Sequence, residues 1–167
     1  MMSPISPRFT YKLVSANDLA KFSELVVDHH VREFLMEGEE LSIEECQEFI
    51  STSQALHAQH GLGLYLIHSE NDVVGYCGFM NTHPPSADLD VVYAFPKKQS
   101  GKGYATEVCK ALVEFAKTAK FTGGITAVVN PENTASIKVL EKSGFKNEGY
   151  CTGDLDHLLK YRCEFPA

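Results

Sequence analysis

Several features are missing from this sequence of 167 residues, and each absence excludes a class of protein. No apolar run approaches the roughly 18–20 residues that a membrane-spanning helix needs, so we expect no membrane partner. The N-terminus has no cationic segment followed by an apolar core, which a secretory signal peptide requires. Basic residues are outnumbered, with 15 Lys and Arg against 22 Asp and Glu, and the net charge of −7 argues against nucleic acid as a partner.

The cysteines are odd in number and form no CxxC motif: Cys46, Cys77, Cys109, Cys151 and Cys163. This pattern disfavours a disulfide framework and indicates reduced thiols in a cytoplasmic protein. His57 and His60 are three residues apart on an expected helix, which is a spacing that a metal site can use. The sequence offers no evident third ligand, so we predict a solvated face and no metal.

The length suggests one domain over residues 1–167, with residues 1–8 as a loose or edge-lying lead-in. Ser15 with Asp18, and Ser42 with Glu45, are serine–acid pairs of the kind that begins helices. Alternating and apolar runs predict strands at 9–14, 64–67, 73–80, 88–95, 125–129, 145–151 and 158–165. Helical spacing predicts helices after Ser15, after His29, and over 42–61, 104–119 and 134–143. We therefore expect an α/β (α+β) fold whose mixed sheet has six or seven strands and helices on both faces.

The stretch at residues 100–106 is the centre of this organisation, because it joins the expected strand at 88–95 to the clearest amphipathic helix. A helix N-terminus has unpartnered N–H groups and a partial positive charge, and so it binds anions. Gly101 and Gly103 allow a tight turn and a close approach by phosphate. Lysines surround the turn: Lys97, Lys98 and Lys102. The turn predicts a site for a phosphate-bearing ligand, and the alternative is an ordinary turn with solvated lysines. The strands that flank the helix, at 88–95 and 125–129, should be parallel.

Two segments, residues 93–107 and 130–145, together resemble the GCN5-related N-acetyltransferase (GNAT) superfamily, in particular its ribosomal-protein N-terminal acetyltransferase-like (RimJ/RimL-like) branch. The second segment is highly specific, and the order of elements matches from about Phe9 to Phe165. The resemblance implies a GNAT-type sheet in which the fourth and fifth strands splay apart around acetyl-CoA. It also implies an acyltransferase that moves an acetyl group directly to a primary amine.

The resemblance assigns acetyl-CoA to residues that the glycine turn already suggested. Its pyrophosphate would lie on backbone N–H groups of the turn, and its pantetheine arm would pair with the strand backbone at residues 93–95. Asn133 would reach the pantetheine or the thioester end, and Lys142 would approach the phosphates or be solvated at the surface. The cofactor-binding residues are thus expected to be Tyr93, Ala94, Phe95, Ser100, Gly101, Lys102, Gly103, Tyr104, Ala105, Thr106, Asn133, Ser136 and Lys142. Ser100 departs from the Gln or Arg that often begins the family motif.

The catalytic expectations start from a second departure. Many GNAT enzymes carry a tyrosine at the position of Leu140, where it protonates the departing thiolate, and leucine cannot do this. Ser136 matches a serine near the CoA sulfur in the ribosomal-protein branch, so we expect it to donate a hydrogen bond to the thiolate. We expect Asp90 to be the base, directly or through water, and a backbone N–H near Phe95 to hold the oxyanion. The alternative for Asp90 is a solvated or salt-bridged carboxylate.

The acceptor amine is the least determined part. An α-amino group has a pKa of about 7.7–8.0 and needs little help to become neutral, whereas a lysine, at about 10.4, needs a base. Residues expected near the acceptor are His29, His30, Arg32 and Asp154. An acidic run from Glu37 to Glu48 would attract a cationic amine or simply be solvated. A protein N-terminus and a small amine both remain open, the chain could be a monomer or a homodimer, and the rival function is a CoA-binding module without catalysis.

Overall fold

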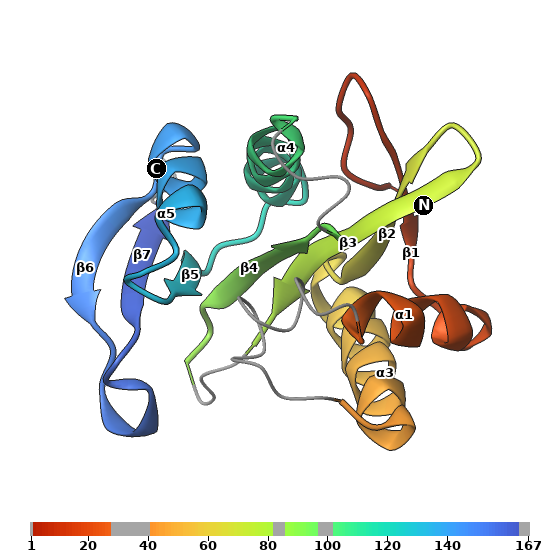
Figure 1. Cartoon of the computed structure of the whole chain (residues 1–167), viewed down its shortest axis with the longest axis horizontal. Helices are drawn as coiled ribbons and strands as arrows, with labels where there is room; N and C mark the ends of the chain where they lie inside the picture. The colour runs from red at the N-terminus through yellow and green to blue at the C-terminus, as the bar shows by residue number, and fades with distance from the viewer. Residues whose placement is uncertain (1, 28–40, 82–85, 97–101, 164–167) are drawn as a thin grey trace.

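The computed structural model describes residues 2–27, 41–81, 86–96 and 102–163, and its centre is a seven-stranded sheet (Figure 1). The strand order across the sheet is β1-β2-β3-β4-β5-β7-β6. The strands are β1 (Thr10–Leu13), β2 (Leu64–Ser69), β3 (Asp72–Met80), β4 (Leu89–Ala94), β5 (Ile125–Val129), β6 (Lys146–Tyr150) and β7 (Leu159–Cys163). The expected number of strands and the parallel pairing of β4 with β5 are confirmed.

The helices are α1 (Leu19–Val26), preceded by a 3-10 turn at Ala16–Asp18, α3 (Ile43–His60), α4 (Tyr104–Thr118) and α5 (Thr134–Lys142). The first two helical segments begin where the serine–acid pairs predict, whereas α4 begins after Gly103 and α5 after Asn133. At the start of α3, Ser42 Oγ accepts a hydrogen bond from the backbone N–H of Glu45 at 3.1 Å, and the Glu45 carboxylate accepts one from Ser42 N at 3.1 Å. The helix expected after His29 falls in 28–40, outside the described residues.

Helices cover both faces of the sheet, as predicted, and each face has its own core (Figure 1). On one face, Leu112 of α4 and Leu140 of α5 pack with the strands. On the other face, Phe22 of α1 and Ile50 of α3 pack against Tyr76 of β3. The two cores follow from the alternation of strand side chains, because successive residues point to opposite faces.

The two central strands separate along their length, which confirms the splay that the resemblance implies. Only two pairs join β4 to β5 among the described residues, Leu89 with Ile125 and Asp90 with Thr126. Beyond them β4 continues to Ala94 and β5 to Val129. The backbone groups that face the gap therefore have no strand partner, and an extended ligand can bond to them.

Two features of the fold differ from the expectations or go beyond them. The end of the expected lead-in packs against the domain and is not loose, because Pro4 is buried and Ser6 Oγ forms a 2.7 Å hydrogen bond with Tyr11 Oη. The C-terminal hairpin is present, but β7 and not β6 pairs with β5, so that β6 becomes the edge strand.

Candidate active site

The start of α4 is built to accept an anion. Its N-cap is Gly103, with φ of +76°, and no side chain in the described part of the chain caps this helix. The first N–H groups of a helix have no partner within it, so those of Tyr104, Ala105 and Thr106 are available to a ligand. Lys102 and Gly103 are exposed beside them. Ser100 and Gly101, the other expected members of this turn, lie outside the described residues.

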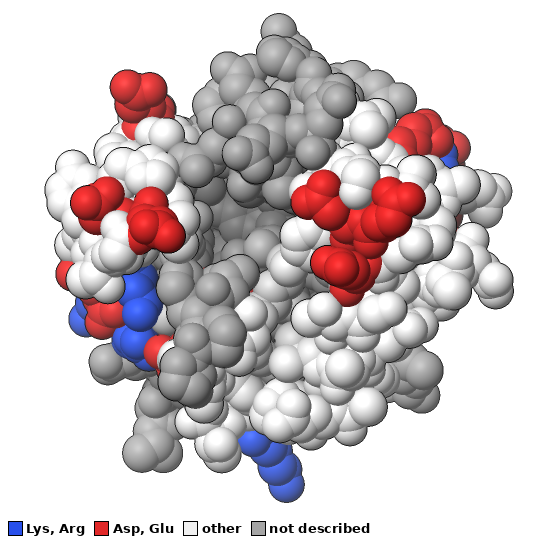
Figure 2. Space-filling view, turned by 90° about the horizontal axis from the view of Figure 1, so that it is seen from below, with Lys and Arg blue, Asp and Glu red and all other residues white. Residues whose placement is uncertain are grey.

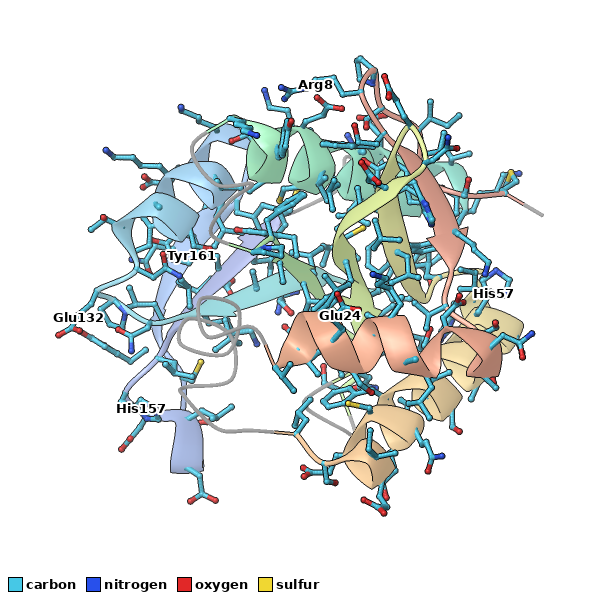
Figure 3. The ribbon with its side chains drawn as sticks, turned by 45° about the vertical axis from the view of Figure 1, so that its right-hand side comes forward. Arg8, Glu24, His57, Glu132, His157 and Tyr161 are labelled. Atoms are coloured by element: carbon cyan, nitrogen blue, oxygen red, sulfur yellow. The ribbon has the colours of Figure 1, made fainter. Side chains whose placement is uncertain are left out.

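Arg8 anchors this helix start to the N-terminal segment, a role that sequence reasoning missed (Figure 3). Its backbone N–H and its Nε donate to the two carboxylate oxygens of Glu107 at 2.9 and 2.6 Å, and its Nη1 donates to the Lys102 carbonyl at 3.0 Å. Its guanidinium also lies 4.7 Å from the centroid of the Tyr104 ring. Partial burial raises the pKa of Glu107, but the bonds from Arg8 outweigh it and hold that pKa below its usual value. Arg8 thus holds the start of α4 against the N-terminal segment.

Aromatic rings connect the end of β4 to the same turn. Phe95 is buried, and its ring centroid lies 5.7 Å from that of Tyr104 and 6.2 Å from that of Phe9. Phe9 and Tyr104 meet edge to face at 4.9 Å. The expected pantetheine-binding strand and the expected phosphate site are therefore parts of one packed unit. The expected oxyanion role of the backbone near Phe95 stays a prediction.

Across the gap between β4 and β5, Tyr93 reaches α5. Its Oη lies 2.8 Å from Ser136 Oγ, a hydrogen bond between residues 43 apart in sequence. Burial raises the pKa of the Tyr93 phenol, so the phenol is protonated throughout the neutral range. Asn133 caps α5, and its Oδ1 accepts from Ser136 N at 3.1 Å. The amide oxygen of Asn133 is thus occupied in holding Ser136 in place.

Asp90 lies at the point where β4 and β5 part. Its side chain is buried, at 5% exposed, and accepts a short hydrogen bond from Thr126 Oγ1. Asp90 and Tyr93 are three residues apart on β4, and successive residues of a strand point to opposite faces. The Tyr93 and Asp90 side chains therefore lie on opposite faces of the sheet. Neither pairing, Tyr93 with Ser136 or Asp90 with Thr126, has a local signal in the sequence.

The remaining residues that the sequence brought into consideration are spread over several elements of the fold. Leu140 is buried in the core at 1% exposed, and Lys142 is exposed in the last turn of α5. Asp154 is exposed in the connection between β6 and β7. His29, His30 and Arg32 lie outside the described residues. His57 lies on α3, and no group of three metal-ligating side chains occurs in the described residues.

Acidic side chains form separate groups on one face of the molecule (Figure 2). At the start of α3, Glu44, Glu45 and Glu48 are exposed. In the β6–β7 connection, Asp154 and Asp156 are exposed. Such an arrangement favours a cationic ligand over an anionic one. None of the helices that the structure describes is long and apolar enough to cross a membrane.

Comparison with known proteins agrees with this geometry. The model of the acetyltransferase (GNAT) domain family matches residues 8–146. The uncharacterized N-acetyltransferase p20 of Bacillus licheniformis is 32% identical over 84 residues, which are 50% of this chain and 47% of that protein. The matched part thus spans about half the length of this curated relative.

Solved structures share the fold. An acetyltransferase from Agrobacterium tumefaciens aligns with a TM-score of 0.83 at 18% identity, over 99% of this chain and 96% of that one. RimL, a ribosomal L7/L12 alpha-N-protein acetyltransferase in complex with coenzyme A, aligns with a TM-score of 0.75 at 19% identity, over 95% of each chain. At these identities the likeness shows the fold alone.

Proposed function

Because the chain belongs to the GNAT acetyltransferase family, we propose that it transfers an acetyl group from acetyl-CoA directly to a primary amine. The observation that carries this proposal is the parting of β4 and β5 next to the uncapped start of α4. The gap offers strand backbone to an extended arm that carries amides, and the helix start offers N–H groups to a pyrophosphate. Acetyl-CoA has both parts at the corresponding ends.

The residues present fit this co-substrate. The N–H groups of the first turn of α4 would hold the pyrophosphate, with Lys102 beside them. The backbone of β4 at Tyr93 and Ala94 would bond to the pantetheine arm. Ser136 would then be near the sulfur, because Tyr93 brings its hydroxyl to the gap. The roles of Lys142 and of the Asn133 amide nitrogen in this site are proposals from the family resemblance alone.

Transfer would proceed by direct attack. The neutral amine nitrogen attacks the thioester carbon, the C–N bond forms, and the C–S bond breaks with its electron pair going to sulfur. The proton that the nitrogen loses passes to Asp90 or to water and finally reaches the sulfur, so that the products are an amide and free CoA. Ser136 would donate a hydrogen bond to the sulfur while its charge develops. Asp90 would face the amine from the opposite side of the gap.

The acceptor we propose is a cationic amine, either a protein N-terminus or a small molecule such as a polyamine, an amino acid or an antibiotic. The exposed carboxylates of α3 and of the β6–β7 connection support this class. We further propose that residues 1–167 form one domain that acts in the cytoplasm as a monomer or a homodimer. The rival function is a CoA-binding module without catalysis, and the observation that favours it is Leu140 at the usual position of the acid.

The test begins with thermal unfolding in the presence of acetyl-CoA, ATP or NAD. At a hundredfold excess over Kd, a ligand stabilises by about 2.7 kcal/mol, and this raises the Tm of a domain of this size by roughly 5–10 °C. We expect that shift with acetyl-CoA alone, followed by CoA release in a screen of amines. Binding without CoA release for any amine would favour the rival module. No shift at millimolar acetyl-CoA would overturn the proposal.

A further inference from the structure

We propose that Tyr93 is the positioning residue of the thiolate site: its phenol donates to Ser136 Oγ and thereby directs the Ser136 hydroxyl hydrogen towards the CoA sulfur. This inference rests on the proposed function. In this proposal a tyrosine phenol helps to stabilise the departing thiolate, although residue 140 is a leucine. The observation that carries it is the 2.8 Å contact between Tyr93 Oη and Ser136 Oγ across the gap.

The direction of this hydrogen bond follows from chemistry. Both groups are hydroxyls, and each can donate once and accept. A phenol is far more acidic than an alcohol and is therefore the better donor and the poorer acceptor, so Tyr93 donates and Ser136 accepts. Ser136 then retains a free hydrogen, while Asn133 Oδ1 fixes the backbone N–H of the same residue at 3.1 Å. Ser136 is thus held at two atoms, and its remaining donor is free for a ligand.

The phenol also strengthens the donor that it positions. In a partly buried chain of hydrogen bonds, each bond polarises the next, so a serine that accepts from a phenol becomes a better donor. Burial raises the pKa of Tyr93, and loss of its proton to a thiolate is therefore unfavourable. Tyr93 accordingly keeps its proton during the reaction and acts through Ser136. This distinguishes it from a general acid, whose proton would be transferred.

The geometry of α5 explains how a residue of β4 can lie next to the proposed thiolate site. Ser136 and Leu140 are four residues apart and lie on the same side of the helix. Leu140 is buried in the core, so its position serves packing in this chain. Tyr93 meets the helix one turn earlier, from the opposite side of the gap. A phenol is therefore next to the thiolate site, but it comes from β4.

The test compares Tyr93→Phe, Ser136→Ala and the double variant. Each single change should lower kcat by about ten- to a hundredfold, as loss of one donor to a developing charge does. The double variant should be no slower than Ser136→Ala, because Tyr93 acts only through Ser136. The KM for acetyl-CoA should change little. Losses that multiply in the double variant would overturn the inference and indicate two independent roles.

Tyr11→Phe is the matched control. Tyr11 forms a tyrosine–serine hydrogen bond of the same kind, 2.7 Å long, to Ser6, but on the edge strand β1, which β2 and β3 separate from β4. Its removal should leave kcat unchanged. If Tyr11→Phe lowered kcat as much as Tyr93→Phe does, the effect would come from loss of stability, and the inference would be wrong.

A second measurement needs no acceptor amine and so separates this inference from the proposed function. The carbon next to sulfur in isotopically labelled CoA reports the ionisation of the bound thiol in an NMR titration against pH. We expect the pKa of that thiol to rise by about one unit in Tyr93→Phe and in Ser136→Ala relative to wild type. Such a rise without transfer to any amine would reject the enzyme and retain the hydroxyl pair. Acetyl transfer to an amine together with an unchanged thiol pKa in Tyr93→Phe would support the enzyme and reject the role of Tyr93. Failure to bind CoA would overturn both the proposed function and this inference.

Discussion

The Arg162 guanidinium donates to the Asp88 carboxylate at 2.8 Å, and this pair closes the end of the gap where β4 and β5 still touch. Asp88 also accepts from the backbone N–H of Gly124, immediately before β5, at 3.0 Å. The bond from Arg162, the largest influence, and the N–H of Gly124 lower the pKa of Asp88 although partial burial raises it. The Asp88 carboxylate, immediately before β4, thus contacts both the residue before β5 and Arg162 on β7, the strand beyond β5.

Asp88→Asn should therefore destabilise the protein by about 1–3 kcal/mol, the usual cost of losing hydrogen bonds to a charged group, and lower Tm by several degrees. Because the folded pKa of Asp88 is depressed, its contribution is present above the ordinary pKa of about 3.9 and is lost as the pH falls through the folded value. Urea unfolding at neutral and acidic pH measures both effects. Glu24→Gln, which breaks the exposed pair of Glu24 with Lys21, should change little. Equal losses in both variants would contradict this account.

Arg8→Ala should weaken acetyl-CoA binding several-fold while kcat at saturating acetyl-CoA stays close to wild type. The reason is that Arg8 holds the Lys102 carbonyl and the Glu107 carboxylate, and so fixes the helix start before binding. Calorimetric titration measures the affinity. Lys12→Ala, which removes a similar exposed ion pair with Asp18, is the control and should bind normally. An unaltered affinity in Arg8→Ala would show that the helix start needs no anchor.

Gly103→Ala and Gly61→Ala form a matched pair. Both glycines have φ of +76° and ψ of +10°, Gly103 at the start of α4 and Gly61 at the end of α3. Alanine in this left-handed conformation costs about 1–2 kcal/mol, so both variants should lose similar stability. Only Gly103→Ala should weaken acetyl-CoA binding, because only its added methyl lies beside the proposed phosphate site. Equal affinities in the two variants would place the phosphate elsewhere.

Asp90→Asn should lower kcat/KM and shift its pH profile if Asp90 is the base. The loss should be larger for a lysine-like amine than for an α-amino group, because the α-amino group is already partly neutral near pH 8. Stopped assays with two acceptors across a range of pH test this. The amide keeps the shape of the carboxylate and can still accept from Thr126, so the fold should persist. An unchanged profile would leave proton removal to water.

The local parts of this structure could be predicted from the sequence because their causes are local. The serine–acid pair of Ser42 and Glu45 begins α3, and the alternation along β4 places Tyr93 and Asp90 on opposite faces. The glycine turn predicts a phosphate site at the start of α4 and the resemblance predicts a role for Ser136, and both roles stay predictions.

The contacts that complete the site could not be predicted, because each joins residues far apart in sequence. Arg8 meets Glu107 across 99 residues, and Tyr93 meets Ser136 across 43. The alternation of residues along β4 does not predict which residue of α5 Tyr93 contacts. The hairpin signal at the C-terminus does not by itself tell which of its strands joins β5, although the polar sequence of β6 suits an edge strand and β7 alternates apolar and charged residues.

The short pairing of β4 with β5 should affect the cooperativity with which the protein unfolds. Strands β1–β4 lie within residues 10–94 and strands β5–β7 within residues 125–163, so the sheet consists of two contiguous pieces of chain whose strands pair at only two residue pairs among the described residues. Such pieces tend to open as separate cooperative units, each with its own free energy. We expect native-state amide hydrogen exchange to resolve two units in the free protein. A ligand that bonds to both strands should merge them into one, so that acetyl-CoA changes the cooperativity of unfolding as well as its midpoint.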